Sequence, residues 1–258
     1  MADAHYPDQL IAMLEAIWGE GFLSPGGPEE VARVIAGHNI TGLSVLDIGC
    51  GAGGVDVALA RNHGAGFVTG IDVEDPVIEH ARKLIARHGL AERIGLAKVA
   101  PGPLPFPPGT FDVVFSKDSI VHIPDKAVLM ADVYRVLRPG GWFLASDWLI
   151  GTDSISQRMA DYIASEGLDF GMATATRYMQ AMAAAGFRHC ETISRNAWYR
   201  EQARTELERL RGSTGREAEK IVGGDFVKKN IGIWERMIPV LDSGEHCPTH
   251  LRAQRPGA

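Results

Sequence analysis

The first 150 residues alternate short apolar runs with amphipathic segments. The apolar runs predict β-strands at 44–48, 67–73, 94–99, 111–116 and 142–148. Apolar residues at helical spacing, together with first-turn acids and prolines, predict helices between them at 56–62, 75–88 and 125–137. Strands that alternate with helices predict an α/β fold with a doubly wound, mostly parallel sheet and right-handed crossovers.

The segments on either side of this core have a weaker pattern. Residues 8–18 and 28–37 predict two helices before the first strand. After residue 148 we predict an edge strand at 189–194, an irregular tail at 245–258, and helices at 156–166, 177–185, 197–210 and 225–241. No internal repeat and no linker divides the chain, which favours a single domain.

A glycine-rich turn follows the first predicted strand. In VLDIGCGAGG, Gly49, Gly51 and Gly53 stand at alternating positions, where the backbone can approach a ligand that a Cβ would exclude. Asp72 ends the next predicted strand, where its carboxylate can bind a ribose diol. This layout predicts a nucleoside-containing cofactor. The glycines fit both NAD and S-adenosylmethionine, since Gly49, Gly51 and Gly54 also match GxGxxG.

The segments around this turn distinguish the two cofactors. LDIGCGAGG, GIDV, PFPPGTFDVV and LRPGG together make residues 31–148 resemble class I S-adenosylmethionine-dependent methyltransferases. The resemblance implies S-adenosylmethionine as the cofactor. It also implies cofactor contacts from the glycine turn and from Asp47, Asp72, Val73, Val99, Ala100 and Ser116. Ala100 stands where many members have an acid that binds the adenine amine, so adenine recognition would depend on backbone groups and on Val99.

A second resemblance concerns the methyl acceptor. The runs HYPDQLIAMLEAIWGEGFLSPGG and SKDSIVHIPDK are similar to the phosphoethanolamine N-methyltransferases of nematodes and malaria parasites. In that family a tyrosine and a histidine form a dyad over the acceptor amine, and the matching residues here are Tyr6 and His122. The family's aspartate near the amine matches Asp118. Phe22 and Ser24 match positions close to acceptor and cofactor.

The chemistry of amine methylation gives such a dyad a role. Methyl transfer to nitrogen needs a lone pair, and an alkylamine with a pKa of about 10.4 is only about 1 part in 10³ neutral at pH 7, a cost of roughly 4–5 kcal/mol. A base such as His122, oriented by the Tyr6 hydroxyl, can remove that proton. Without the resemblance, a lone histidine after a strand is also typical of a residue packed on a helix.

The region after the fifth strand departs from this family. Its members hold the acceptor phosphate with tyrosines and an arginine, whereas Trp148, Glu166 and Leu168 stand at these positions here and Tyr162 is retained. Because a glutamate repels phosphate and attracts a cation, these residues favour an acceptor without phosphate. Lys229, or its neighbour Lys228, is either an anion contact or an exposed helix lysine.

Aromatic residues can complete the acceptor site. Trp18, Phe22, Trp148 and Tyr162 are candidates for a cage around a sulfonium or a methylated ammonium group. The alternative for the two tryptophans is that they form part of the core or of the pocket wall.

Composition and charge narrow the class of protein. The 258 residues carry a formal net charge of −6 with no Lys/Arg cluster, so nucleic acid is not expected as a partner. No apolar run reaches the ~18 residues of a membrane span, and the N-terminal residues lack a signal-peptide pattern, so we expect a cytoplasmic protein. Three well-separated cysteines indicate reduced thiols. His246, Cys247 and His250 lack a fourth ligand, so no metal is expected.

These observations predict a methyltransferase that uses S-adenosylmethionine and acts on a small polar acceptor. An amine nitrogen is favoured over a thioether sulfur, a carboxylate or a hydroxyl. A non-catalytic S-adenosylmethionine-binding module is the alternative of another class, and the Tyr/His pair argues against it. We expect one domain over 1–258: an N-terminal lid (1–30), a cofactor-binding core (31–150), and a C-terminal part (151–258) that completes the sheet and caps the acceptor. The oligomeric state stays open.

Overall fold

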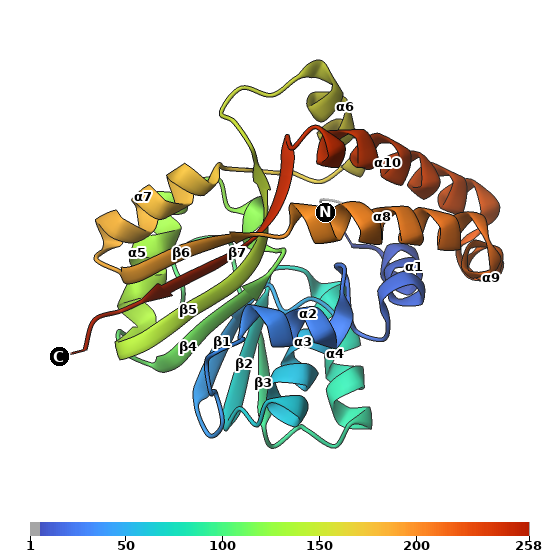
Figure 1. The fold of residues 1–258 in the computed structure, drawn as a ribbon. Helices are drawn as coiled ribbons and strands as arrows, with labels where there is room; N and C mark the ends of the chain where they lie inside the picture. The colour runs from blue at the N-terminus through green and yellow to red at the C-terminus, as the bar shows by residue number, and fades with distance from the viewer. Residues whose placement is uncertain (1–5, 258) are drawn as a thin grey trace.

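A single mixed sheet forms the centre of the molecule (Figure 1). The structure is a computed structural model that describes residues 6–257. The strands are β1 (Ser44–Ile48), β2 (Phe67–Asp72), β3 (Ile94–Lys98), β4 (Phe111–Lys117), β5 (Leu137–Ile150), β6 (Arg188–Ser194) and β7 (His246–Gln254). Their order is β3-β2-β1-β4-β5-β7-β6. Strands β1 to β5 pair in parallel and β7 is antiparallel to both neighbours, which confirms the predicted doubly wound α/β fold.

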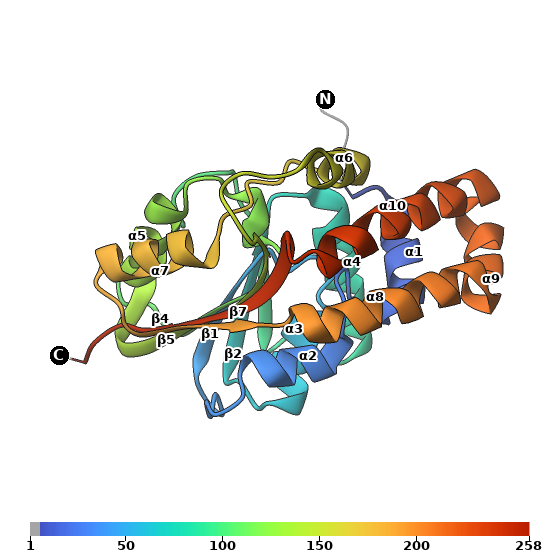
Figure 2. The ribbon, with the colours of Figure 1, turned by 45° about the horizontal axis from the view of Figure 1, so that its top comes forward.

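Helices cover both faces of this sheet (Figure 2). Alternate strand residues point to opposite faces, so Leu46 and Val114 pack in one apolar core while Val45 and Val113 pack in the other. The first face is covered by α5 (Lys126–Val136) and α7 (Ala175–Ala185). The second is covered by α2 (Gly27–Val34), α3 (Gly54–Val57), the π-helical turn Ala58–Asn62 and α4 (Asp75–Arg87).

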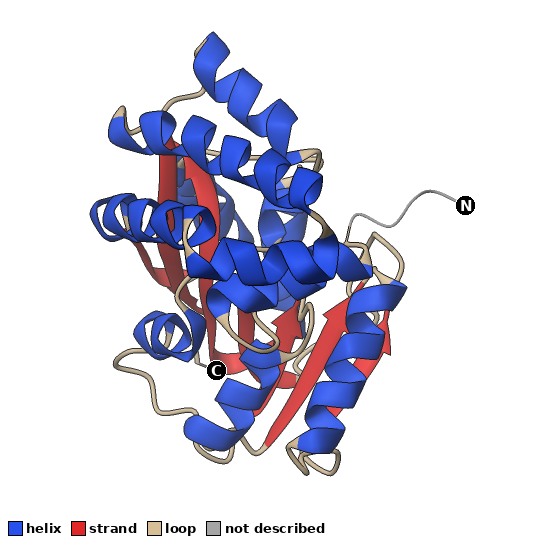
Figure 3. Cartoon of the chain, turned by 90° about the vertical axis from the view of Figure 1, so that its right-hand side faces the viewer, coloured by secondary structure: helices blue, strands red, loops and turns tan. Residues whose placement is uncertain are grey.

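A helical cap stands over the carboxyl ends of the parallel strands. It consists of α1 (Asp8–Trp18), α6 (Gln157–Glu166), α8 (Asn196–Arg211), α9 (Ser213–Val222) and α10 (Gly224–Asp242). These helices share a third apolar core, which combines residues from the two ends of the chain. Figure 3 shows helices packed against one another next to the strands of the sheet. Chain segments far apart in sequence therefore meet above the sheet, where ligands bind in open α/β folds.

The C-terminal segment contradicts one prediction. Residues 245–258 were expected to be irregular, but His246–Gln254 form strand β7, inserted between β5 and β6. The sequence hides this strand because Pro248 interrupts it and because polar residues occupy buried positions. His250 is buried against the Glu30 carboxylate, and Arg252 donates to the carbonyl of Arg33. Tertiary partners satisfy these polar groups and make a buried strand possible.

Helix boundaries differ from the prediction in two further places. The helix α9 was not predicted, and the first crossover helix begins at Gly54 and becomes π-helical from Ala58. By contrast, the start of α5 agrees with the helix predicted at 125–137, because the Asp125 side chain caps it by accepting from the backbone N–H of Val128 at 3.0 Å. Within residues 6–257, no helix has both the length and the apolar character needed to cross a bilayer.

Candidate active site

The glycine turn connects β1 to α3 at the carboxyl edge of the sheet. Gly49, Gly51 and Gly53 all have positive φ, at 74°, 52° and 88°. A Cβ on Gly49 would lie 1.7 Å from the Ser119 hydroxyl, so the close approach at this turn requires glycine.

Asp72 lies beside this turn at the end of β2. Its carboxylate accepts from the backbone N–H groups of Gly51 and Glu74, each at 3.0 Å. These two bonds fix the orientation of the carboxylate and leave further lone pairs for a ligand hydroxyl. The next residue, Val73, is 43% exposed and gives the same edge an apolar surface.

Two more carboxyl groups lie beneath the turn. Asp47 and Asp56 are buried, and neither makes a hydrogen bond of regular geometry with the described residues. Burial raises the pKa of both, and repulsion among the neighbouring carboxyls adds to the rise. The predicted cofactor contact of Asp47 stays a prediction, because its side chain is enclosed.

The remaining predicted cofactor residues lie in different surroundings. The Ser116 hydroxyl is buried in the sheet and donates to the carbonyl of Ile48 at 2.8 Å, so its visible role is to join β4 to β1. The Val99 N–H donates to the carbonyl of Asp72 at 2.9 Å, and Ala100 is exposed. A cofactor contact of Ser116, Val99 or Ala100 stays a prediction.

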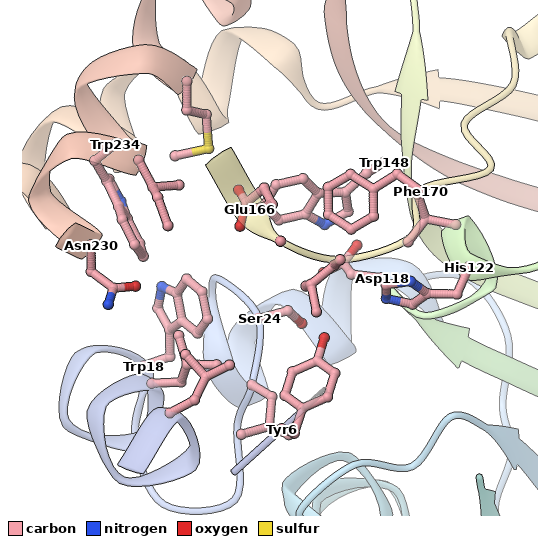
Figure 4. A pocket seen from close by; sticks show the side chains of 18 of the residues that line it. Tyr6, Trp18, Ser24, Asp118, His122, Trp148, Glu166, Phe170, Asn230 and Trp234 are labelled. Carbon is pink, nitrogen blue, oxygen red and sulfur yellow. The ribbon is translucent and has the colours of Figure 1, made fainter. Parts of the chain in front are cut away.

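A cavity of about 350 Å³ lies between the sheet edge and the helical cap (Figure 4). Its volume suits a small ligand. It brings together seven residues predicted for the site: Tyr6, Trp18, Ser24, Asp118, His122, Trp148 and Glu166. Phe22 instead packs in the core under α2, and Tyr162 is fully buried in the third core, so neither belongs to the cavity wall.

His122 ends the short 3₁₀ turn Ile120–His122 that follows β4. Its Nδ1 lies 3.0 Å from the backbone carbonyl of Asp169, and its ring lies 5.4 Å from the ring of Phe170. Because a carbonyl oxygen can only accept, this contact assigns the proton to Nδ1. The neutral imidazole then has its lone pair on Nε2.

Tyr6 faces the same cavity from the segment before α1. In Figure 4 its hydroxyl points into the cavity, toward the side where Asp118 and His122 lie. Burial raises the pKa of Tyr6, and the carboxylates of Asp72 and Glu166 raise it further, so the hydroxyl keeps its proton at neutral pH. Tyr6 is therefore a hydrogen-bond donor in this cavity. Residues 1–5 of the predicted lid lie outside the described residues.

Asp118 is held by neighbours that the sequence did not reveal. Its φ is 55°, in the left-handed region. One carboxylate oxygen accepts from Lys117 Nζ at 2.8 Å and the other from the Ser146 hydroxyl at 2.6 Å. Lys117 is itself buried and also donates to the Ser24 hydroxyl (2.5 Å) and to the carbonyl of Pro25 (2.8 Å). This lysine ties the loop before α2 to the acid that faces the cavity.

Two tryptophans on the cap side of the cavity share one buried acid. The indole N–H groups of Trp18 and Trp234 donate to Glu206, at 2.8 and 3.0 Å. Their rings lie 5.9 Å apart, and Figure 4 shows them side by side between α1 and α10. A charged residue at a position that is apolar by helical spacing was the only sequence signal for Glu206. Trp234 had no signal beyond its place in a helix.

Comparison with known proteins shows which proteins this chain resembles. Residues 45–141 match the family model described as a methyltransferase domain. Phosphoethanolamine N-methyltransferase 1 of Arabidopsis thaliana is 30% identical over 248 residues, which cover 94% of this chain and 48% of that protein. A structure of Haemonchus contortus phosphoethanolamine N-methyltransferase 2, in complex with phosphomonomethylethanolamine and S-adenosylhomocysteine, matches with a TM-score of 0.90 and 25% identity. The match covers 98% of this chain and 58% of that one.

The chain therefore contains a methyltransferase domain, and it has the fold of the class I S-adenosylmethionine-dependent methyltransferases.

The same comparisons show that this chain matches only part of the length of its relatives. The chain spans about half the length of the curated phosphoethanolamine N-methyltransferases that it matches. A sterol 24-C-methyltransferase of Gibberella zeae is also 32% identical, over 157 residues that cover 57% of this chain and 41% of that protein. The resemblance to phosphoethanolamine N-methyltransferases, expected from the sequence, is confirmed.

The residues of the methyltransferase fit its cofactor. The glycines of the turn carry no Cβ that would collide with a bound cofactor. Asp72 presents a fixed carboxylate for the ribose hydroxyls. Val73 offers exposed apolar surface for the adenine. These groups would hold S-adenosylmethionine at the carboxyl ends of β1 and β2, next to the cavity that contains His122 and Asp118.

His246, Cys247 and His250, for which no metal was expected, have partners within the fold. His246 is buried against Trp148, with ring centroids 4.8 Å apart. The Cys247 thiol lies 2.9 Å from the carbonyl of Gly244, and His250 lies 2.7 Å from Glu30. Between residues 6 and 257, no three His, Cys, Asp or Glu side chains are grouped so that they could hold a metal ion.

Proposed function

We propose that this methyltransferase transfers a methyl group to the nitrogen of a small amine, with His122 as the base. The observation that carries the proposal is the bond between His122 Nδ1 and the carbonyl of Asp169, which places the proton on Nδ1 and makes Nε2 the basic nitrogen of the neutral ring. Tyr6, which keeps its own proton, would donate a hydrogen bond that orients the acceptor or the imidazole.

When bound, S-adenosylmethionine supplies a sulfonium methyl group, which the acceptor nitrogen takes through its lone pair as the C–S bond breaks to leave S-adenosylhomocysteine. The ammonium proton passes to His122 Nε2 before this transfer, and the electron pair of the broken N–H bond becomes the lone pair that takes the methyl group. Asp118, fixed by Lys117 and Ser146, would attract the amine to the reacting position. The cavity wall excludes water and aligns the reacting atoms, effects that contribute up to ~7–11 kcal/mol in well-ordered sites.

A product assay with labelled S-adenosylmethionine tests the proposal. Phosphoethanolamine, ethanolamine, butane-1,4-diamine and methionine are offered separately to the wild type, His122→Ala and the control His63→Ala, whose side chain lies at the end of the π-helical turn, outside the cavity. We expect transfer to an amine, and a loss of kcat/KM of about 10²–10⁴-fold in His122→Ala at pH 7. This loss should shrink as the pH approaches the amine pKa of about 10, where the acceptor is neutral without a base.

Two outcomes would contradict the proposal. Transfer to methionine alone, unaffected by His122→Ala, would indicate a thioether acceptor, which needs no base. Binding of the cofactor without transfer to any acceptor would instead favour a non-catalytic binding module.

A further inference from the structure

A polar recess at one end of the cavity is formed by Glu166 and Tyr199, with Tyr162 and His246 buried behind them. Glu166, at the end of α6, and Tyr199, on α8, face the cavity directly. Tyr162 precedes Glu166 by one helical turn, and its ring lies 5.4 Å from the ring of His246. We call these four residues the acidic recess. The recess lies at the side of the cavity away from His122, as Figure 4 shows for Glu166.

The acidic recess contains a buried hydroxyl that faces the cavity. The Tyr199 hydroxyl makes no hydrogen bond of regular geometry with the described residues. The Tyr162 hydroxyl, by contrast, interacts with the Glu166 carboxyl. Because buried polar groups normally have partners, in the protein or in a ligand or water, Tyr199 beside Glu166 indicates a place for a polar group that comes from outside the chain.

The charge of the acidic recess is that of a carboxylate. Among the described residues Glu166 has no ion-pair partner, whereas Asp118, the other acid of the cavity, is paired with Lys117. The cavity's lysine, Lys229, is exposed at its edge and does not neutralise the interior. Burial lowers the pKa of His246 to about 4, so this histidine is neutral and supplies no positive charge.

We propose that the acceptor carries, besides the nitrogen that is methylated, a second and cationic nitrogen, which binds Glu166 in the acidic recess. This inference rests on the proposed amine methylation and names its substrate class: a small diamine without a phosphate group. The Glu166 carboxylate pairs with the cation, and the rings of Trp148 and Tyr199, 5.6 Å apart, provide faces for cation–π contact.

A phosphate ester fits this recess poorly. A phosphate brings about two negative charges next to Glu166, in a site where none of the described lining residues is a buried cation. The diamine has the opposite distribution of charge, since one nitrogen lies near Asp118 and His122 and the other near Glu166. Glu166 thus acts as the residue that selects between the two kinds of acceptor.

The test measures binding separately from transfer. Isothermal titration at pH 8 compares butane-1,4-diamine with phosphoethanolamine, on enzyme saturated with S-adenosylhomocysteine. The variants are Glu166→Gln, which keeps the shape of the side chain, and the control Asp161→Asn, which removes an exposed charge from the same helix. We expect the wild type to bind the diamine more tightly. Glu166→Gln should weaken diamine binding by about 10–100-fold and strengthen phosphoethanolamine binding. Asp161→Asn should change neither affinity.

A pH series adds a second readout. Burial raises the pKa of Glu166 to about 7, so the carboxylate that binds the cation is present above this pH and is lost below it. Diamine affinity of the wild type should therefore fall between pH 8 and pH 6, while that of Glu166→Gln should change much less across the same range.

Each result decides between the two proposals. Tighter binding of phosphoethanolamine by the wild type, absence of diamine binding, or a diamine Kd within twofold in Glu166→Gln would overturn the acidic recess. These results would leave amine methylation intact if labelled methyl groups still reach an amine. If a diamine binds through Glu166 but no amine is methylated, the proposed amine methylation is wrong, while the proposed role of the acidic recess stands.

Discussion

Glu30 joins three distant parts of the chain, and its replacement should be costly. The carboxylate is 2% exposed and accepts from Arg195 through two bonds of 2.8 Å and from His250 at 2.7 Å. It thereby connects α2 with the start of α8 and with β7, so the packing of the helical cap and of strand β7 depends on it. The change to test is Glu30→Gln, which keeps the size of the side chain and removes its charge.

The magnitude follows from the pKa of this carboxyl. Burial raises the pKa of Glu30, but hydrogen bonds from His250 and Arg195 outweigh burial and lower it from 4.5 to about 2. This difference corresponds to about 3 kcal/mol of folding free energy. Because the pKa is lowered on folding, the contribution is complete above pH 4.5 and is lost as the pH falls toward 2. At pH 3 about 1 to 1.5 kcal/mol should remain.

Urea unfolding followed by tryptophan fluorescence measures this contribution. We expect Glu30→Gln to lose about 3 kcal/mol of unfolding free energy relative to the wild type at pH 7, and clearly less at pH 3. The control is Glu29→Gln, an exposed neighbour in the same helix turn, which should stay within about 0.5 kcal/mol. An equal gap between wild type and Glu30→Gln at both pH values, or a gap below about 1 kcal/mol at pH 7, would refute the reasoning.

Two further predictions concern the contacts that shape the cavity. A Cβ on Gly54 would lie 2.7 Å from the backbone of Gly21, whose carbonyl accepts from the Gly54 N–H at 3.0 Å. We therefore expect Gly54→Ala to lose about 1–3 kcal/mol of stability in urea unfolding and to bind S-adenosylhomocysteine more weakly in titration. Gly224→Ala, where a Cβ meets no atom within 4 Å, should be neutral, and equal behaviour of the two variants would contradict the prediction. Glu206→Gln should cost about 1–3 kcal/mol, because the amide retains one acceptor oxygen for the indoles of Trp18 and Trp234. It should also raise the acceptor KM by loosening the cavity wall, whereas the exposed Glu208→Gln should leave unfolding and KM unchanged.

The sequence alone determined the parallel half of the molecule. Strands β1 and β4 and residues 142–150 of β5 are apolar runs because they are largely buried, and β2 and β3 are apolar segments at and next to the sheet edge. Each can be recognised without knowing its partner. The glycine turn and Asp72 were equally visible, since backbone conformation and strand ends are local properties. The motifs around them were sufficient to predict the resemblance to methyltransferases and the cofactor.

The tertiary structure decided which predicted residues share a cavity. Tyr6, His122 and Glu166 come from three separate segments of the sequence, and they line one cavity only in the folded chain. Phe22 was expected at the acceptor but packs under α2. Sequence position fixes neither the direction of a loop side chain nor the neighbour that it meets.

The tertiary structure alone also determined the C-terminal half of the sheet and the groups that support the site. Strand β7 carries buried polar residues that are stable only because their partners arrive from far away, as Glu30 does for His250 across 220 positions. Lys117 beside Asp118 depends on such contacts in the same way. The spacing of apolar residues along a strand or helix shows which of them are buried. The pairing of polar groups is not recorded locally, because each partner satisfies the other only after the chain has folded.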